Sequence, residues 1–338
     1  MERISWIDWI KATAVVTVVF CHLPQSQDWF YYRYLQTTII TVFFFVSGYL
    51  KKDRANQREN WRKYWHSLVV PYLLLNAIIY PFWIAKFAMT NGAWPSLADS
   101  LRPIVGALLF QHESSYATHL NGALWYLPAV LMMHLLIDAT NTRRSVAKPL
   151  MVSFCILSVL LYAACKYWGL AHNLTPIGFL RRLPFYYLGY LMGRQRLLCD
   201  YRPWRDAAMS AACLLLSLPL FYWHLHEERL WLHLALFYAV SLLFVFTVVF
   251  GCKLISTPHR SPQPNVITTL SIGTLLVIGL HEPLITVINY AIRLCTGITT
   301  TPLYHWYEAL PLALLITALL YPVILWSMRH LPILMGRS

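Results

Sequence analysis

Three ionisable residues lie in the first apolar stretch of the chain, where their types and spacing would suit proton-transfer chemistry. Lys11 and His22 are eleven residues apart, with Asp8 three residues before Lys11. On a helix, eleven residues make three turns plus about 20° and rise about 16 Å, so these side chains share one face. One polar stripe therefore runs along the helix, and its members are candidate functional residues. The simpler interpretation is that Lys11 snorkels to the inner headgroups while His22 marks the outer interface.

A second pair of ionisable residues, His281 and Glu282, directly precedes Pro283 in a later apolar stretch. Counting residues along the two stretches places this pair and His22 in the same half of a membrane. They could share one site, with the carboxylate orienting an imidazole. The simpler interpretation is that His281 bonds a neighbouring carbonyl at a kink set by Pro283. Both residues are candidate catalytic groups, because an ionisable residue inside a membrane is costly unless it faces a polar interior.

Candidate binding residues lie at the ends of other apolar stretches. The basic cluster Arg58, Arg62 and Lys63 could bind the phosphates of a nucleotide-like donor, or it could only set topology and contact anionic lipid. The segment that contains Ser47 and Tyr49 is a further candidate for donor binding. Its small residues would equally allow plain helix packing.

On the opposite side of the membrane, Arg181 and Arg182 could contact an anion or a sugar polyphosphate, or they could snorkel at the interface. Trp125 and Asp8 complete the set of candidate substrate-binding residues, although tryptophan is common at membrane interfaces anyway. The histidines and cysteines show no metal-ligand spacing, so the sequence predicts no metal site.

The elements that must position these residues are membrane helices. The chain has 338 residues, of which 58% are hydrophobic and only 12% charged. A soluble domain carries about 25% charged residues, so a soluble enzyme is excluded. A bilayer needs about 20 apolar residues per helix. This criterion predicts an all-α bundle with about ten spans, at residues 6–23, 33–50, 67–88, 122–139, 149–170, 178–193, 205–224, 231–251, 266–290 and 308–328.

The basic residues predict the orientation of this bundle. Eighteen of the 27 Lys and Arg residues fall on one side of the predicted spans. Cytoplasmic loops carry such an excess, so both termini are expected in the cytoplasm. The net charge of +13 then reflects topology and not nucleic-acid binding. We expect one membrane domain over residues 1–338, with no separate soluble domain. Its sizeable outer loop, 89–121, could include a re-entrant or interfacial helix at 101–110.

Several short motifs occur in an order that resembles the membrane acyltransferase-3 family. They are Lys11 followed eleven residues later by His22, the segment FFFVSGYL at 43–50, VVPY at 69–72, LWY at 124–126, RRLPFYYLGYLMG at 181–193 and HEP at 281–283. The chain departs from the family pattern where Lys11 replaces the commoner arginine. It departs again where Tyr64 and Ser67 stand at positions that are often basic.

The resemblance implies a stand-alone form similar to common-antigen and capsule O-acetyltransferases of the bacterial inner membrane. Such enzymes transfer an acyl group, usually acetyl, from cytoplasmic acyl-CoA to a hydroxyl of a sugar or cell-envelope glycan. By resemblance, His22 is the catalytic residue and Lys11 supports donor handling. The partners would then be acyl-CoA, a sugar or lipid-linked glycan, and membrane lipids. The alternative is a glycan or metabolite transporter or flippase that uses the same intramembrane charges. No internal symmetry of two broken-helix halves supports that alternative.

Overall fold

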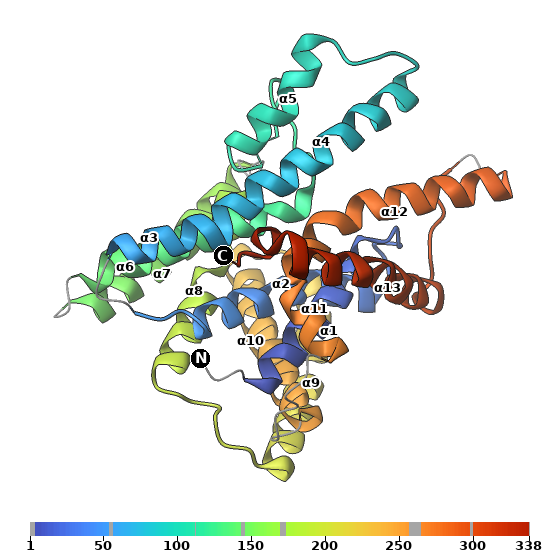
Figure 1. Cartoon of the computed structure of the whole chain (residues 1–338). Helices are drawn as coiled ribbons and strands as arrows, with labels where there is room; N and C mark the ends of the chain where they lie inside the picture. Colours follow the sequence, from blue (N-terminus) through green and yellow to red (C-terminus); the bar gives the residue numbers. More distant parts are fainter. Residues whose placement is uncertain are drawn as a thin grey trace. The chain divides into compact units, whose positions relative to one another are not determined.

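A computed structural model describes residues 4–53, 57–111, 113–142, 146–169, 174–256, 265–297 and 300–337. Within these ranges every regular element is a helix and no strand occurs, which confirms the predicted all-α class (Figure 1). The helices are α1 (Ser5–His22), α2 (Phe30–Tyr49), α3 (Gln57–Tyr64), η1 (Trp65–Val69), α4 (Val70–Asn91), α5 (Leu97–Leu108), η2 (Gly122–Trp125), α6 (Tyr126–Asn141), α7 (Ala147–Tyr167), α8 (Leu174–Arg194), α9 (Pro203–His226), α10 (Leu230–Ile255), α11 (Val266–Ile272), α12 (Thr274–Thr296), α13 (Trp306–His330) and η3 (Pro332–Met335).

Seven helical segments in the described ranges are long and apolar enough to cross a membrane. They are Gln57–Asn91, Gly122–Asn141, Ala147–Tyr167, Pro203–His226, Leu230–Ile255, Thr274–Thr296 and Trp306–His330. The remaining predicted spans correspond to α1, α2 and α8, whose polar residues lower their mean hydropathy. The chain is therefore a helical protein with membrane-spanning character. The count of about ten spans and the cytoplasmic termini stay predictions.

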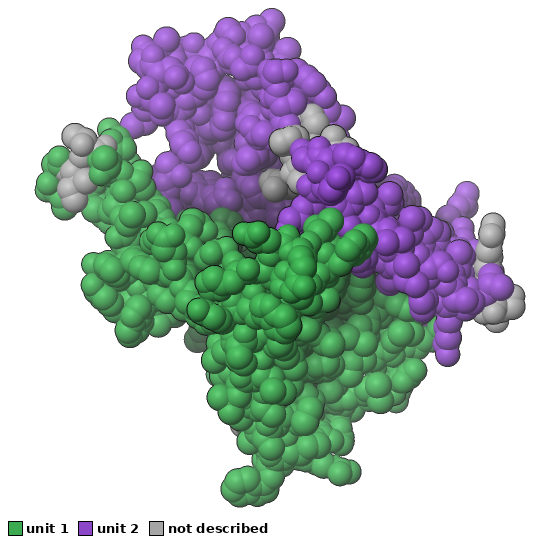
Figure 2. Space-filling view, turned by 180° about the vertical axis from the view of Figure 1, so that it is seen from behind, with its two compact units in different colours: residues 1–52, 184–274, 289–324 green, residues 53–183, 275–288, 325–338 purple. Residues whose placement is uncertain are grey.

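The chain forms two compact units, coloured separately in Figure 2. Unit 1 comprises residues 1–52, 184–274 and 289–324, and unit 2 comprises residues 53–183, 275–288 and 325–338. Helices α8, α12 and α13 contribute residues to both units. Each unit is described by itself below, and the expectation of one membrane domain stays a prediction.

In unit 1, helix α2 packs against α8 through glycines that let the two backbones meet. A Cβ added at Gly48 would lie 1.9 Å from the carbonyl oxygen of Tyr186, and one added at Gly189 would lie 2.0 Å from that of Phe45. A Cβ added at Gly193 would likewise lie 2.2 Å from the carbonyl oxygen of Tyr49. Small residues at such spacing permit close helix packing. The packing interpretation of the segment around Ser47 therefore holds for Gly48.

A buried ion pair joins α9 to α10 in the same unit. Asp206 is fully buried and Lys253 is only 2% exposed, and Lys253 Nζ lies 3.2 Å from an Asp206 carboxylate oxygen. Lys253 also donates to the carbonyl oxygen of Asp200 at 2.7 Å, and Arg205 donates to Asp206 at 3.0 Å. Because these partners satisfy one another, the charges are tolerated away from water. The cluster anchors the loop that leads into α9.

In unit 2, α3, η1 and α4 form one continuous helical run of 35 residues, Gln57–Asn91. The predicted span 67–88 covers only its apolar part, because the apolar pattern does not extend into the polar α3. The π-helical turn η1 lies just before Pro71, which has no N–H to continue the regular ladder. Helix α5 begins at Leu97, four residues before the expected 101–110 helix, because Ser96 accepts a hydrogen bond from the N–H of Asp99 and caps it.

The loop after α5 is anchored on α4 by buried polar side chains. Gln111 is fully buried, and its Nε2 donates to the hydroxyl of Tyr72 at 3.1 Å and to Oδ1 of Asn76 at 3.3 Å. The Tyr72 hydroxyl in turn donates to the carbonyl oxygen of Ala107 at 2.5 Å. These bonds hold the start of the segment 111–121 in place, and this segment leads directly into η2.

Candidate active site

Helix α1 carries the three ionisable residues of the predicted polar stripe in unit 1. The hydroxyl of Ser271, on α11, donates a hydrogen bond of 2.6 Å to Oδ1 of Asp8. Asp8 therefore ties α1 to α11 and is held in one orientation by a neutral donor. Lys11 lies one turn further along α1 and is half-buried.

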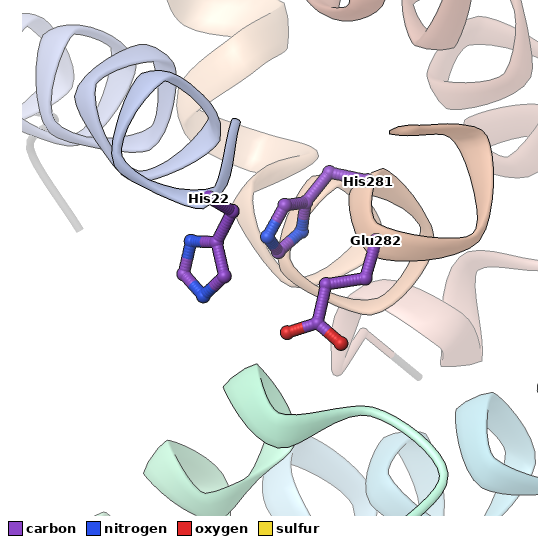
Figure 3. Close-up of side chains that lie close together, drawn as sticks. All are labelled: His22, His281 and Glu282. Atoms are coloured by element: carbon purple, nitrogen blue, oxygen red, sulfur yellow. The ribbon is translucent and has the colours of Figure 1, made fainter. Parts of the chain in front are cut away.

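His22 stands at the last position of α1 with its side chain exposed (Figure 3). Its Nδ1 lies 2.8 Å from the carbonyl oxygen of Val18, one turn earlier in the helix. Because a carbonyl oxygen only accepts, Nδ1 carries the hydrogen of the neutral ring and Nε2 keeps the basic lone pair. The helix itself thus fixes the tautomer that a general base requires.

His281 has the same local arrangement on α12, in unit 2. The residue is fully buried, and its Nδ1 lies 2.8 Å from the carbonyl oxygen of Val277 (Figure 3). This is the bond to a neighbouring carbonyl that the simpler interpretation of His281 predicts. The same bond also makes Nε2 the basic nitrogen of the neutral ring.

Glu282 binds the start of a helix in unit 2. Its Oε2 accepts the N–H of Gly122 and its Oε1 accepts the N–H of Ala123, each at 3.2 Å. These are the first N–H groups of η2, which continues into α6. A helix N-terminus has unsatisfied donors and a partial positive charge, so a carboxylate is favoured there. The two bonds fix the orientation of the Glu282 carboxylate.

The side chain of Asn121 supplies the hydrogen-bond donor that α12 lacks at Pro283. Pro283 has no N–H, so the carbonyl oxygen of Gly279, four residues earlier, has no helical donor. The side-chain amide of Asn121 donates to this oxygen at 2.7 Å and to that of Ile278 at 3.3 Å. Its Oδ1 accepts the N–H of Ala123 at 2.8 Å and caps η2. A single buried side chain thus joins the proline break in α12 to the helix start that Glu282 binds.

The predicted acceptor-side residues Trp125, Arg181 and Arg182 all lie in unit 2. The Arg182 guanidinium lies 5.3 Å from the centre of the Trp125 ring, and that of Arg181 lies 5.5 Å from the Tyr162 ring. The Trp125 ring covers Gly178, where an added Cβ would lie 2.1 Å from a ring carbon. Both arginines therefore stack on aromatic rings, and Trp125 belongs to η2, the helix start that Glu282 binds.

The predicted donor-side residues are divided between the two units. The Tyr49 hydroxyl donates to the carbonyl oxygen of Leu197 at 2.6 Å in unit 1, so it supports the loop after α8. Ser47 is half-buried on α2. Exposed basic side chains follow one another along α3 in unit 2, namely Arg58, Arg62 and Lys63.

Sequence reasoning missed the roles of Ser271 and Asn121. The Asn121 cap has a local signal, an asparagine directly before a helix start. Its second role has a signal in Pro283, which guarantees an unpaired carbonyl four residues earlier. Neither signal identifies the partner, because the two segments lie 158 residues apart in the chain.

A family model for an acyltransferase domain matches residues 4–329, nearly the whole chain. The chain belongs to the acyltransferase-3 family. No curated protein and no solved structure matches it. Membership confirms the family that the motifs from Lys11 to Pro283 resemble, and together with the apolar helices it indicates a membrane acyltransferase.

Proposed function

We propose that this acyltransferase transfers an acetyl group from cytoplasmic acetyl-CoA to a hydroxyl of a sugar or cell-envelope glycan, in the bacterial inner membrane. The observation that carries the proposal is the hydrogen bond that the His22 ring makes, in a chain that belongs to this family. The bond from Nδ1 to the Val18 carbonyl leaves Nε2 as the base.

In the proposed reaction, Nε2 of His22 takes the proton of the acceptor hydroxyl as the oxygen attacks the thioester carbonyl. The carbon–sulfur bond breaks, and the CoA thiolate leaves and takes the proton back from the imidazolium. The products are the acetyl ester and free CoA. General base catalysis of this kind contributes about 10²–10⁴-fold to the rate.

The polar residues of α1 and α3 would handle the donor. CoA carries several phosphate charges, and the exposed side chains of Arg58, Arg62 and Lys63 suit an anionic group. Lys11 lies on the face of α1 that leads to His22, so it would guide the donor along that stripe. Replacement of Lys11 by alanine is expected to raise the KM for acetyl-CoA.

The residues around η2 would handle the acceptor. Arg181 and Arg182 are cations stacked on aromatic rings, which suits an anionic lipid-linked sugar. The Glu282 carboxylate, held by two backbone N–H groups, would orient a hydroxyl of this substrate. His281 supplies a second imidazole whose Nε2 is basic.

The proposal is tested by release of free thiol from acetyl-CoA by the purified protein in nanodiscs. His226 provides a matched control, because it too is exposed near a helix end, with its Nδ1 2.8 Å from the carbonyl oxygen of Tyr222. We expect His22→Ala to lower the rate by about 10²–10⁴-fold and His226→Ala to retain it. Equal rates for wild type and His22→Ala would contradict the role of His22. A wild type that neither binds nor consumes acetyl-CoA would favour the transporter alternative.

A further inference from the structure

Four aromatic side chains form a stacked row in unit 1, namely Tyr31, Trp29, His305 and Tyr307. The rings of Tyr31 and Trp29 have their centres 5.8 Å apart and their planes inclined by 22°. The Trp29 ring is stacked on that of His305 at 4.5 Å, and the His305 ring on that of Tyr307 at 5.3 Å, with interplanar angles of 28° and 5°. This aromatic row joins the start of α2 to the start of α13, and the reaction proposed above does not use it.

The backbone around the aromatic row is held by hydrogen bonds. The N–H of Tyr304 donates to the carbonyl oxygen of Pro24 at 2.9 Å, which joins the segment before α13 to the segment before α2. The Tyr304 hydroxyl donates to Oδ1 of Asn289, on α12, at 2.7 Å. The Glu308 carboxylate accepts the backbone N–H of His305 at 2.8 Å and closes the first turn of α13. The row is therefore supported on both sides, as a surface that orients a ligand must be.

One buried side chain connects the aromatic row with the turn of α1 that carries His22. Gln25 is only 5% exposed, and its Nε2 donates to the carbonyl oxygen of Phe20, two residues before His22, at 2.7 Å. Oε1 of the same amide accepts the hydroxyl of Tyr31 at 3.3 Å. Because both bonds go to one amide group, the first ring of the row lies close to the last turn of α1. The row and His22 also belong to the same compact unit.

The far end of the row is open. The Tyr307 side chain remains 56% exposed although His305 covers one side of its ring. Trp306 is 57% exposed, and its ring stands nearly perpendicular to that of Tyr307, at 83° with the centres 5.9 Å apart. The two rings therefore form an exposed corner, and the side of the Tyr307 ring that faces away from His305 is accessible.

The chemistry of this corner matches a sugar ring. An aromatic face carries partial negative charge, and the C–H groups on one face of a pyranose carry partial positive charge, so the two stack. The hydroxyls around the pyranose then need polar partners beside the aromatic surface. The exposed Glu308 carboxylate and His305 imidazole supply an acceptor and a donor there. Tryptophan and tyrosine also anchor helices at a membrane interface, but that role requires neither parallel rings nor a carboxylate beside them.

We propose that the exposed side of Tyr307, with Trp306 beside it, stacks on a sugar ring of the acceptor glycan, and that a hydroxyl of this ring donates to the Glu308 carboxylate. Three ring-to-ring steps separate Tyr307 from Tyr31, so the stacked sugar is a different one from the sugar that reacts at His22. This inference rests on the proposed acyl transfer and deepens it, because it specifies an acceptor of at least two sugar rings.

The test compares an acceptor of several rings with an acceptor of one ring. Thiol release by the purified protein in nanodiscs is measured with acetyl-CoA and increasing amounts of either a bacterial envelope glycolipid extract or N-acetylglucosamine. Tyr307→Ala and Trp306→Ala remove the stacking surface, whereas Tyr307→Phe keeps the ring. Tyr222→Ala is the matched control, because Tyr222 is 61% exposed and its ring also lies on an imidazole, that of His226, at 4.5 Å.

We expect Tyr307→Ala to raise the half-saturating concentration of the extract by about three- to tenfold, the effect of one aromatic stack. Trp306→Ala should raise it in the same direction, and Tyr307→Phe and Tyr222→Ala should match the wild type. Neither the rate with N-acetylglucosamine nor the KM for acetyl-CoA should change in any of these variants.

An unchanged half-saturating concentration in Tyr307→Ala would overturn the inference while the proposed function stands. A loss of the same size with N-acetylglucosamine, or an extract that does not accelerate thiol release by the wild type, would overturn it too. If Tyr307→Ala and Tyr222→Ala lower the melting temperature alike and leave acceptor use unchanged, the Tyr307 ring is a membrane anchor and the inference is wrong. Absence of acetyl-CoA binding and turnover in the wild type would instead overturn the proposed function itself, and this inference with it.

Discussion

Replacing Asn121 with alanine tests whether one side chain joins the proline break in α12 to the start of η2. The variant loses the shorter of the two bonds to the N–H of Ala123, which keeps its 3.2 Å bond to Glu282, and it loses the donor to the carbonyl oxygen of Gly279. Loss of such a cap costs about 1 kcal/mol. A buried carbonyl left without a donor costs about 1–3 kcal/mol. We therefore expect Asn121→Ala to lower the free energy of unfolding by about 2–4 kcal/mol.

A double-mutant cycle with Pro283→Ala isolates the contribution of the bond from Asn121 to the carbonyl oxygen of Gly279. Alanine at position 283 restores the backbone N–H, which can then bond the carbonyl oxygen of Gly279. In that background, Asn121→Ala should cost only the cap, about 1 kcal/mol. The predicted coupling energy between Asn121 and Pro283 is therefore about 1–3 kcal/mol.

The cycle is measured by denaturant unfolding of the four proteins in one detergent, followed by circular dichroism and by tryptophan fluorescence. Agreement between the two probes establishes that each free energy refers to one transition. Asn121→Ala could lower the free energy of unfolding by the same amount with proline and with alanine at position 283. That result would refute the assignment of Asn121 as partner of the Gly279 carbonyl. The cap at Ala123 would then be its only role.

Two further predictions concern the packing of unit 1 and its response to pH. Gly189→Ala should destabilise the protein by about 1–3 kcal/mol, because the added Cβ would lie 2.0 Å from the backbone carbonyl oxygen of Phe45. Gly251→Ala should change the midpoint of thermal unfolding less, because its Cβ would meet only the Ser210 hydroxyl, at 3.3 Å. Equal midpoints for the two variants would contradict the backbone contact between α2 and α8. The Arg229 guanidinium lowers the pKa of the Glu227 carboxyl from 4.5 to about 2. The stability from this pair is present above pH 4.5 and lost as the pH falls towards 2, so the melting temperature of Glu227→Gln should fall less than that of the wild type over this range. Parallel pH profiles would contradict the assignment.

The sequence predicts most helices because their signals are local. The predicted spans 205–224, 231–251 and 308–328 fall within α9, α10 and α13, whose uniform apolar runs have clear ends. The predicted span 266–290 is instead divided into α11 and α12 at Gly273. At this division Gly273 packs directly on Ile324 of α13, a tertiary contact that local sequence signals do not reveal.

The candidate site is less accessible to sequence reasoning because its contacts join distant segments. The sequence identifies Asp8 and Glu282 as charged residues in apolar surroundings, which is a local signal. It does not identify their partners, the hydroxyl of Ser271 and the first N–H groups of η2.

The central claim is most directly tested by following the acetyl group into its product. Membranes that contain the wild type, His22→Ala or the control His226→Ala are incubated with acetyl-CoA that carries a heavy-isotope acetyl group, and envelope glycans are analysed by mass spectrometry. The account predicts a labelled acetyl ester on a glycan hydroxyl with the wild type and with His226→Ala, and its near absence with His22→Ala at equal protein level. Equal labelling by His22→Ala, or no labelled glycan from the wild type, would contradict it.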